Sequence, residues 1–251
     1  MTNEEVIKRQ KQDIRKTVWS KMEETHLARF PMPVYGRIPN FADARLAAKR
    51  LCETEAFKNA ETVFCCPDSP QRWVRLAVLG QDKNLVMASP RLKEDFILLD
   101  PHQIDPTHYA EASTIAGAFK HGKHIGPANL KVDFKVTGSV AVTMEGGRVG
   151  KGGGYSDLEY AILREFHCIT KETPIATTVH DIQVVVWVPM DPNHDMPVDL
   201  IATPTRLVAT GTRLPKPSGI DWRLLSEKQV REIPLLRLLP ELKLNHRKTA
   251  N

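Results

Sequence analysis

A glycine-rich segment in the second half of the chain has the composition of a phosphate-binding loop. Residues 146–154 hold six of the fourteen glycines, together with Arg148 and Lys151. Glycine lets the backbone adopt positive φ and lets its N–H groups approach a ligand directly. A strand-like apolar run at 132–143 precedes the loop, and a helical pattern at 156–166 follows it. A strand, a glycine loop and a helix N-terminus together form an anion site, so the sequence predicts a polyphosphate ligand.

The loop matches neither of the two commonest nucleotide-binding patterns. A Walker A loop ends in Gly-Lys followed by Ser or Thr, but Lys151 is followed by Gly152. The dinucleotide fingerprint G-x-G-x-x-G fails because its third glycine would fall on Tyr155. The alternative to a ligand site is a flexible hairpin turn. The two cations within the loop favour nucleotide phosphate, bound on some other fold.

The elements that position this loop alternate between helical and strand-like patterns. Helices are predicted at 4–28, 42–55, 71–79, 107–119, 156–166 and 226–239. Strands are predicted at 62–66, 85–89, 96–99, 175–180, 184–188 and 200–203. The strands are short and apolar without alternation, as in a sheet that is covered on both faces. This order predicts an α/β fold, a single domain with a largely parallel central sheet flanked by helices in Rossmann-like layers.

Composition narrows the class of protein. The 251 residues show no internal repeat, so one domain is predicted over 1–242, followed by a basic, disordered tail at 243–251. The net charge of +5 suits anionic ligands such as nucleotides, polyglutamates or RNA, although nucleic acid is not the favoured partner. The polar stretch 120–124 is predicted to be a solvated loop.

The compartment is predicted from what the sequence lacks. Its four cysteines include no C-x-x-C pair, which argues against zinc and against a disulfide scaffold. The first 21 residues are charged and helical rather than an apolar signal core. No apolar run approaches the roughly 18 residues that a membrane span needs. We therefore predict a cytoplasmic protein that does not enter a membrane.

The glycine loop and three further motifs resemble one enzyme family. Residues 148–157 are similar to the nucleotide loop of the methenyltetrahydrofolate synthetase (5-formyltetrahydrofolate cyclo-ligase) family, whose pattern reads R-x-G-[KR]-G-x-G-Y-[YS]-D. Lys11 and Arg15 match its K-x-x-x-R pair, and their spacing puts both on one helix face. Gln183 matches a glutamine within a later strand, and 194–199 resemble the H-D-x-x-V-D segment. The likeness spans nearly the whole chain.

The resemblance is strongest to one branch of that family. Residues 37–41, 138–142 and 154–161 resemble the methenyltetrahydrofolate synthetase domain-containing proteins and their prokaryotic relatives. The main family has a glutamate-threonine substrate motif after its first strand, whereas residues 67–75 contain no glutamate. The nucleotide site is therefore matched more completely than the folate site.

The resemblance implies an ATP- and Mg²⁺-dependent ligase that cyclises 5-formyltetrahydrofolate to 5,10-methenyltetrahydrofolate. The formyl oxygen takes the γ-phosphoryl group, a nitrogen of the pterin side chain closes on the activated carbon, and phosphate leaves. Positive side chains would neutralise the phosphoryl charge. The implied catalytic residues are Lys11, Arg15, Arg148 and Lys151. The implied nucleotide site comprises these four with Val149, Gly150, Gly152, Gly153, Gly154, Tyr155 and Ser156. Asp157 and Asp199 are the implied Mg²⁺ ligands.

Several alternatives stay open. Lys11 and Arg15 could lie on an ordinary solvated helix face. Ser156 and Glu159 have the spacing of a capping box, which we favour over a third metal carboxylate. His180 and His194 are predicted to be polar anchors rather than proton carriers. Two other functions compete: a ligase for a different one-carbon pterin carrier, and a non-catalytic nucleotide- or RNA-associated module. The oligomeric state is open.

Overall fold

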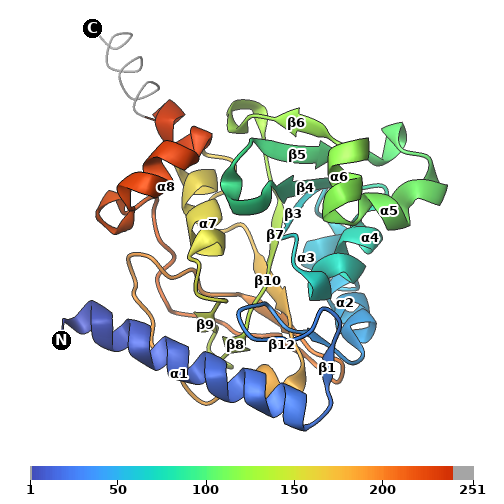
Figure 1. Ribbon diagram of the computed structural model, residues 1–251. Coiled ribbons are helices and arrows are strands. Elements are labelled where there is room, and N and C mark those ends of the chain that lie inside the picture. Colours follow the sequence, from blue (N-terminus) through green and yellow to red (C-terminus); the bar gives the residue numbers. More distant parts are fainter. Residues whose placement is uncertain (1, 240–251) are drawn as a thin grey trace, which may run out of the picture.

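A central sheet of eight strands organises the molecule. The computed structural model describes residues 2–239 (Figure 1). The strand order is β12-β11-β10-β7-β3-β4-β5-β6. The bounds are β3 Thr62–Cys65, β4 Asn84–Ala88, β5 Phe96–Leu99, β6 Lys123–Ile125, β7 Phe134–Thr137, β10 Ile175–Thr178, β11 Leu200–Ala202 and β12 Leu207–Ala209. The five central strands run parallel, and the pairings β11–β12, β4–β5 and β5–β6 are antiparallel. The predicted α/β fold with a largely parallel sheet is confirmed.

Helices cover both faces of this sheet (Figure 1). Their bounds are α1 Asn3–Glu24, α2 Ala44–Cys52, α3 Glu55–Lys58, α4 Arg72–Gly80, α5 Tyr109–Ala112, α6 Ile115–His121, α7 Tyr155–Glu165 and α8 Glu227–Glu232. Successive side chains of a strand point to opposite faces. Val63 and Cys65 of β3 therefore join the core beneath α2 and α4, whereas Phe64 joins the core beneath α7. Covering both faces explains why the strands are uniformly apolar.

The first helix is held by a third apolar cluster. Val18, Trp19 and Met22 of α1 pack with Val140 and Val149. A small hairpin follows strand β7 in the chain and consists of β8 (Ala141–Val142) and β9 (Arg148–Val149). Val140 directly precedes β8, and Val149 belongs to β9. A second hairpin, β1 (Ala28–Arg29) with β2 (Asn40–Phe41), leads from α1 back to the body of the protein. This packing sets α1 beside the start of the glycine loop.

The topology marks where a ligand should bind. The chain passes from β3 to β4 on one side, and from β7 to β10 and β11 on the other. Open parallel sheets bind ligands outside the carboxyl ends of their strands at such a switch point. Here the switch point lies between the ends of β3 and β7.

Three predicted elements differ from the structure, and one strand of the structure was not predicted. Residues 184–188 form no strand: Val186 is 97% exposed, and only Val184 makes a β-bridge in this segment, to Val142. The predicted helix 107–119 is split, because the Thr114 hydroxyl accepts a hydrogen bond from the Gly117 N–H and starts α6 as a separate helix. The predicted loop 120–124 contains edge strand β6, and β12 was not predicted.

The C-terminal prediction is only partly tested. Residues 227–232 and 234–239 are helical, but Ile233 is not, because a residue that precedes proline is disfavoured in helical conformation. The predicted tail at 243–251 lies outside the described residues. In the part of the chain that the structure describes, no helix combines the length and apolar character needed to cross a membrane.

Candidate active site

The glycine loop leads directly into the N-terminus of α7, as predicted. Gly152 and Gly154 have φ of +104° and +71°, a backbone region that favours glycine. Gly154 is the N-cap of α7 and gives the helix no side-chain cap. The first N–H groups of a helix have no partner within it, and the helix dipole adds positive potential there. The loop and helix start thus present backbone donors for an anion.

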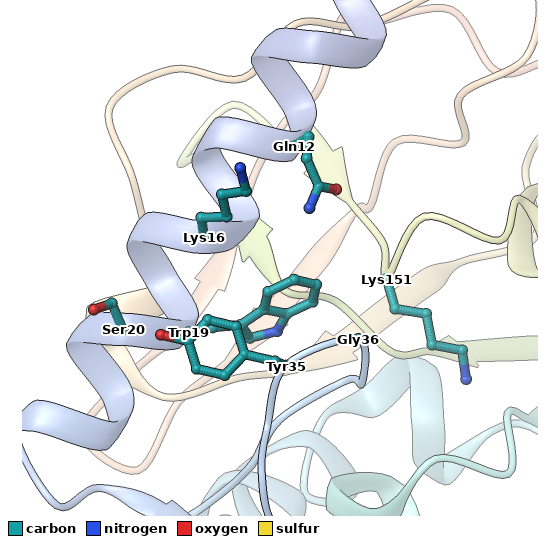
Figure 2. A pocket seen from close by; sticks show the side chains of 7 residues that line it. All are labelled: Gln12, Lys16, Trp19, Ser20, Tyr35, Gly36 and Lys151. Carbon is teal, nitrogen blue, oxygen red and sulfur yellow. The ribbon is translucent and has the colours of Figure 1, made fainter.

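Lys151 of the glycine loop reaches the carboxyl end of β3, where the switch point lies. Its Nζ lies 2.7 Å from the Oδ1 of Asp68, which follows β3. On the neighbouring strand, a Cβ added to Gly138 would lie 2.9 Å from Asp68 Oδ2, so β7 also ends against this carboxylate. Burial acts to lower the pKa of Lys151, but the Asp68 carboxylate outweighs it and raises that pKa. Lys151 also borders an open pocket beside α1 (Figure 2).

Two arginines meet at the start of the loop. Arg15 donates from Nε to the Gly150 carbonyl at 2.7 Å, and a Cβ on Gly152 would lie 3.4 Å from the Arg15 guanidinium carbon. Arg148 is 3% exposed and donates from Nη1 to the Asp157 carboxylate at 3.2 Å. Its Nε is buried with no hydrogen-bond partner. Burial lowers the pKa of Arg15, partly opposed by the charge of Asp195. Arg148, as a buried cation with an unused Nε donor, is suited to bind a phosphate oxygen.

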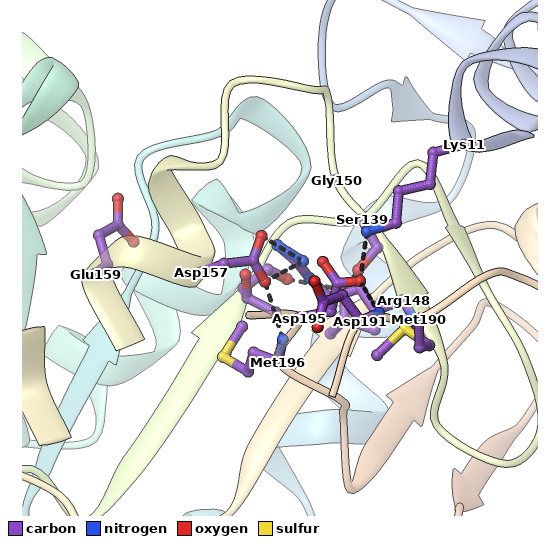
Figure 3. Close-up of polar contacts among 12 residues, drawn as sticks. Lys11, Ser139, Arg148, Gly150, Asp157, Glu159, Met190, Asp191, Asp195 and Met196 are labelled. Carbon is purple, nitrogen blue, oxygen red and sulfur yellow. Dashed lines mark hydrogen bonds and ion pairs between the residues drawn. The ribbon is translucent and has the colours of Figure 1, made fainter. Parts of the chain in front are cut away.

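A compact acidic cluster lies beside Arg148 (Figure 3). Ligand atoms of Asp157, His194 and Asp195 are all within 4.8 Å of one another. The Met196 N–H donates to Asp157 at 3.0 Å, and the Asp191 N–H donates to Asp195 at 2.6 Å. These backbone bonds fix both carboxylates. Lys11 of α1 forms an ion pair with Asp195. The structure therefore brings together Lys11, Arg15, Arg148 and Asp157, which the sequence placed in one site.

Asp199, which the resemblance paired with Asp157, lies outside this cluster of Asp157, His194 and Asp195. Its Oδ2 accepts from the Ile175 N–H at 2.8 Å and from Lys216 at 2.7 Å. These contacts hold the Asp199 side chain at the start of β10 and against Lys216. The adjacent His-Asp pair at 194–195, within the motif already noted, was the sequence signal for the carboxylate that lies beside Asp157.

The predicted capping box at Ser156 is wrong. Helix α7 begins at Tyr155, so Ser156 lies inside it and cannot be the N-cap. Glu159 is instead 5% exposed and faces Lys135, whose Nζ lies 3.6 Å away. Lys135 is completely buried, with its Nζ 4.2 Å from the Phe64 ring centroid. Burial lowers the pKa of Lys135 and raises that of Glu159. A lysine within a predicted apolar strand was the sequence signal for this pair.

The remaining candidates have mixed surroundings. Val149 is 1% exposed and packs in the cluster beneath α1, so only its backbone can serve a ligand. Tyr155 is partly buried against the core, and its ring lies 3.0 Å from where a Gly153 Cβ would be. Gln183 lies in a short 3₁₀ helix rather than a strand, and its amide donates to the carbonyls of Ser139 and Val140.

The two histidines have different surroundings. His180 Nδ1 accepts from the Ile182 N–H at 3.3 Å, and burial lowers its pKa. That contact fits the predicted role of a polar anchor. His194 lies in the acidic cluster instead, next to Asp157 and Asp195.

Comparison with known proteins identifies relatives of this chain. Residues 7–204 match the 5-formyltetrahydrofolate cyclo-ligase family. The methenyltetrahydrofolate synthase domain-containing protein of Homo sapiens is 41% identical over 233 residues, 91% of this chain and 61% of that protein. That of Danio rerio is 37% identical over 236 residues, 92% of this chain and 62% of that protein. The chain thus spans about three fifths of the length of these curated relatives.

A solved structure shares the fold. The NMR structure of Aquifex aeolicus 5,10-methenyltetrahydrofolate synthetase superposes with a TM-score of 0.50 at 20% sequence identity. The alignment covers 80% of this chain and 93% of that one. With the family match over most of the sequence, the chain belongs to the 5-formyltetrahydrofolate cyclo-ligase family.

Proposed function

We propose that this protein uses Mg-ATP to cyclise 5-formyltetrahydrofolate to 5,10-methenyltetrahydrofolate. The formyl oxygen attacks the γ-phosphorus, and the bond to ADP breaks. The N10 nitrogen then attacks the formyl carbon and releases its proton, and the carbon–oxygen bond to phosphate breaks. The observation that carries the proposal is the meeting of the α1 cations, the glycine loop and the Asp157 cluster around one helix N-terminus.

The residues of this chain would bind and orient the triphosphate. The site contains three cations, Lys11, Arg15 and Arg148, and only two carboxylates, those of Asp157 and Asp195. The excess charge and the backbone donors at the start of α7 favour an anion. Phosphoryl transfer spreads negative charge over the non-bridging oxygens, so fixed cations there stabilise its transition state. Arg148 brings an unused Nε donor, and Lys151, which is paired with Asp68 in the structure, adds a fourth cation from the loop itself.

The acidic cluster fits a magnesium ion by its donor chemistry. Asp157 and Asp195 offer carboxylate oxygens, the ligands that Mg²⁺ prefers, and both are held by backbone N–H groups. An imidazole nitrogen suits softer divalent metals better, so His194 would orient a carboxylate or phosphate rather than bind Mg²⁺. Held by Asp157 and Asp195, the ion would supply positive charge to the phosphate groups of the nucleotide. We propose Asp195 in place of Asp199 as the second ligand.

The reduced pterin would enter at the switch point between β3 and β7. Asp68 is the acidic residue at that edge, in the segment where the family's glutamate is missing. Its carboxylate could accept N–H groups of a pterin once Lys151 turns to phosphate. The shorter side chain also favours a second candidate function, a ligase for a different one-carbon pterin carrier.

A phosphate-release assay tests the proposal. Purified protein is incubated with Mg-ATP and, in turn, with 5-formyltetrahydrofolate, with a formylated pterin lacking the benzoylglutamate half, and with no carrier. We expect release with 5-formyltetrahydrofolate and only background without a carrier. Release with another carrier alone would favour the second candidate. ATP binding without release under any condition would identify a binding module instead.

A further inference from the structure

Lys135 and Glu159 form a buried pair that the steps proposed above do not use. Lys135 lies in β7 and is 0% exposed, and Glu159 lies in α7 and is 5% exposed. Residues two apart in a helix lie roughly 200° apart around its axis, so Glu159 and Asp157 face different ways. Figure 3 shows Glu159 pointing away from the cluster that contains Asp157. Helix α7 therefore presents one carboxylate to the triphosphate site and a second one to the central sheet.

Three buried polar atoms meet on this side of the sheet without a hydrogen-bond partner among residues 2–239. They are Lys135 Nζ, Thr137 Oγ1 and Glu159 Oε2. Lys135 Nζ and Glu159 Oε2 are 3.6 Å apart, an ion pair without a hydrogen bond. Lys135 and Thr137 are two residues apart in β7, so both side chains point to the face that α7 covers. Buried polar atoms are nearly always paired, so three such atoms indicate a site for a polar molecule that supplies their partners.

This buried pair lies near the entrance expected for the carrier. The charges of Asp68 and Lys151 both act on Glu159, and the Cys66 thiol acts on Lys135. Cys66 and Asp68 follow the end of β3, and Lys151 belongs to the glycine loop. The pair is therefore in electrostatic contact with the switch point between β3 and β7, where the ion pair of Lys151 and Asp68 lies.

Resting on the function proposed above, we propose that Glu159 binds the aminopyrimidine edge of the pterin and that Lys135 holds this carboxylate in place. The 2-amino group and the N3–H of that edge are two adjacent donors, which one carboxylate accepts through both oxygens. The neighbouring 4-oxo group accepts hydrogen bonds from Lys135 and Thr137. The pterin thus supplies a partner for each of the three atoms. Glu159 also provides, from α7, the carboxylate that residues 67–75 lack.

Electrostatics agree with this assignment. Burial raises the pKa of Glu159, partly opposed by the charge of Lys135. Hydrogen bonds from N–H donors favour the ionised form of a carboxylate, so a bound pterin would lower that pKa again. The site becomes accessible when Lys151 leaves Asp68 for a phosphate group of the nucleotide.

Two variants remove the contact in different ways. Glu159→Gln keeps the size of the side chain but offers only one acceptor oxygen. K135M/E159M removes both charges and leaves no unpaired buried ion. Each should raise the KM for 5-formyltetrahydrofolate about 10- to 100-fold, while kcat and the KM for ATP change little. Asp133→Asn is the matched control, because Asp133 accepts from the Thr62 N–H at 3.0 Å at the opposite, amino end of the same strands.

A carrier analogue separates recognition from stability. The 2-desamino-2-methyl analogue of 5-formyltetrahydrofolate lacks the 2-amino donor. Wild type and Asp133→Asn should show a KM for this analogue at least about tenfold above that for the natural carrier. K135M/E159M should treat the two carriers alike. A purely structural pair would leave the preference for the natural carrier intact in every folded variant, which would overturn the inference.

A binding probe makes the test independent of turnover. Calorimetry with 6-methyltetrahydropterin and a non-hydrolysable ATP analogue should show binding to the wild type, and at least about tenfold weaker binding to Glu159→Gln. Equal probe binding by all variants would overturn the inference while leaving the cyclo-ligase proposal intact. A raised KM for ATP in Glu159→Gln, with an unchanged KM for the carrier, would overturn it in favour of a nucleotide contact. Probe binding that depends on Glu159, without turnover of any folate, would support the contact and contradict the reaction.

Discussion

Lys11 in the first helix forms an ion pair with Asp195, which lies 184 residues further along the chain. Both side chains are largely buried, at 13% and 5% exposed. The pair joins a predicted phosphate cation to a carboxylate of the acidic cluster, so α1 closes one side of the site. On the proposed function, Asp195 would hold the metal ion and Lys11 would face a phosphate group, so binding of Mg-ATP would replace this ion pair.

The choice between Asp195 and Asp199 leads to a comparison of three asparagine variants. Asp157→Asn and Asp195→Asn should reduce turnover at least about 100-fold, with a smaller loss of ATP affinity, because the carboxylates matter most where charge develops in the transition state. Asp199→Asn should retain turnover within a few fold, since Asp199 bonds Lys216 and the Ile175 N–H instead. Steady-state kinetics and ATP titration of all three variants measure this. Loss of turnover in Asp199→Asn with normal Asp195→Asn would restore the original pairing.

Lys151 should contribute to nucleotide affinity. Lys151→Ala removes one charge-assisted contact, for which we expect ATP binding to weaken by about 1–3 kcal/mol. Lys120→Ala is the control, because Lys120 likewise forms an ion pair, at 2.8 Å from Glu111, but lies on α6. Calorimetry with a non-hydrolysable ATP analogue provides the measurement. Equal affinity of both variants and the wild type would exclude a phosphate role for Lys151.

The buried Lys135–Glu159 pair should govern stability. Removing one partner leaves a buried charge without its counterion, so Lys135→Met should destabilise the fold by about 3–5 kcal/mol, and K135M/E159M should recover most of that loss. Burial raises the pKa of Glu159, so the folded state holds this proton more tightly than the unfolded chain. Protonated Glu159 therefore favours the folded state at acidic pH, and this contribution to stability is lost as pH rises through the raised pKa of Glu159.

Urea unfolding of both variants measures these effects. Above pH 4.5, the ordinary pKa of glutamate, the stability of the double variant should fall less with rising pH than that of the wild type. If the double variant loses as much stability as Lys135→Met and Glu159→Met do together, the two side chains do not interact.

The four cysteines should resist modification in the folded protein. All four are free and buried, and burial raises the pKa of Cys65 to about 11 and that of Cys52 and Cys168 to about 12. Because the thiolate is the reactive form, alkylation by iodoacetamide at pH 8 should be very slow in buffer and fast in urea. Labelling followed by mass spectrometry counts the modified thiols. Rapid labelling of Cys66 in buffer would mean that the end of β3 opens readily.

Local patterns predicted the fold better than they predicted the site. Strand 96–99 and helix 156–166 were recognised because their signals, apolar runs and flanking turn residues, are local. Residues 184–188 have the composition of a strand, yet only Val184 forms a β-bridge, to Val142 of the two-residue strand β8. Asp195 and Glu159 were missed for a related reason. Which carboxylate meets Asp157, and which side chain faces Lys135, depends on contacts between residues distant in sequence.

The most direct measurement is the appearance of 5,10-methenyltetrahydrofolate, which has its own near-ultraviolet absorbance. With 5-formyltetrahydrofolate, ATP and Mg²⁺ present, the wild-type protein should form product continuously and release one phosphate per product. Omission of either ATP or Mg²⁺ should stop both signals. A protein that binds ATP but forms no methenyl product from 5-formyltetrahydrofolate would contradict the proposed reaction.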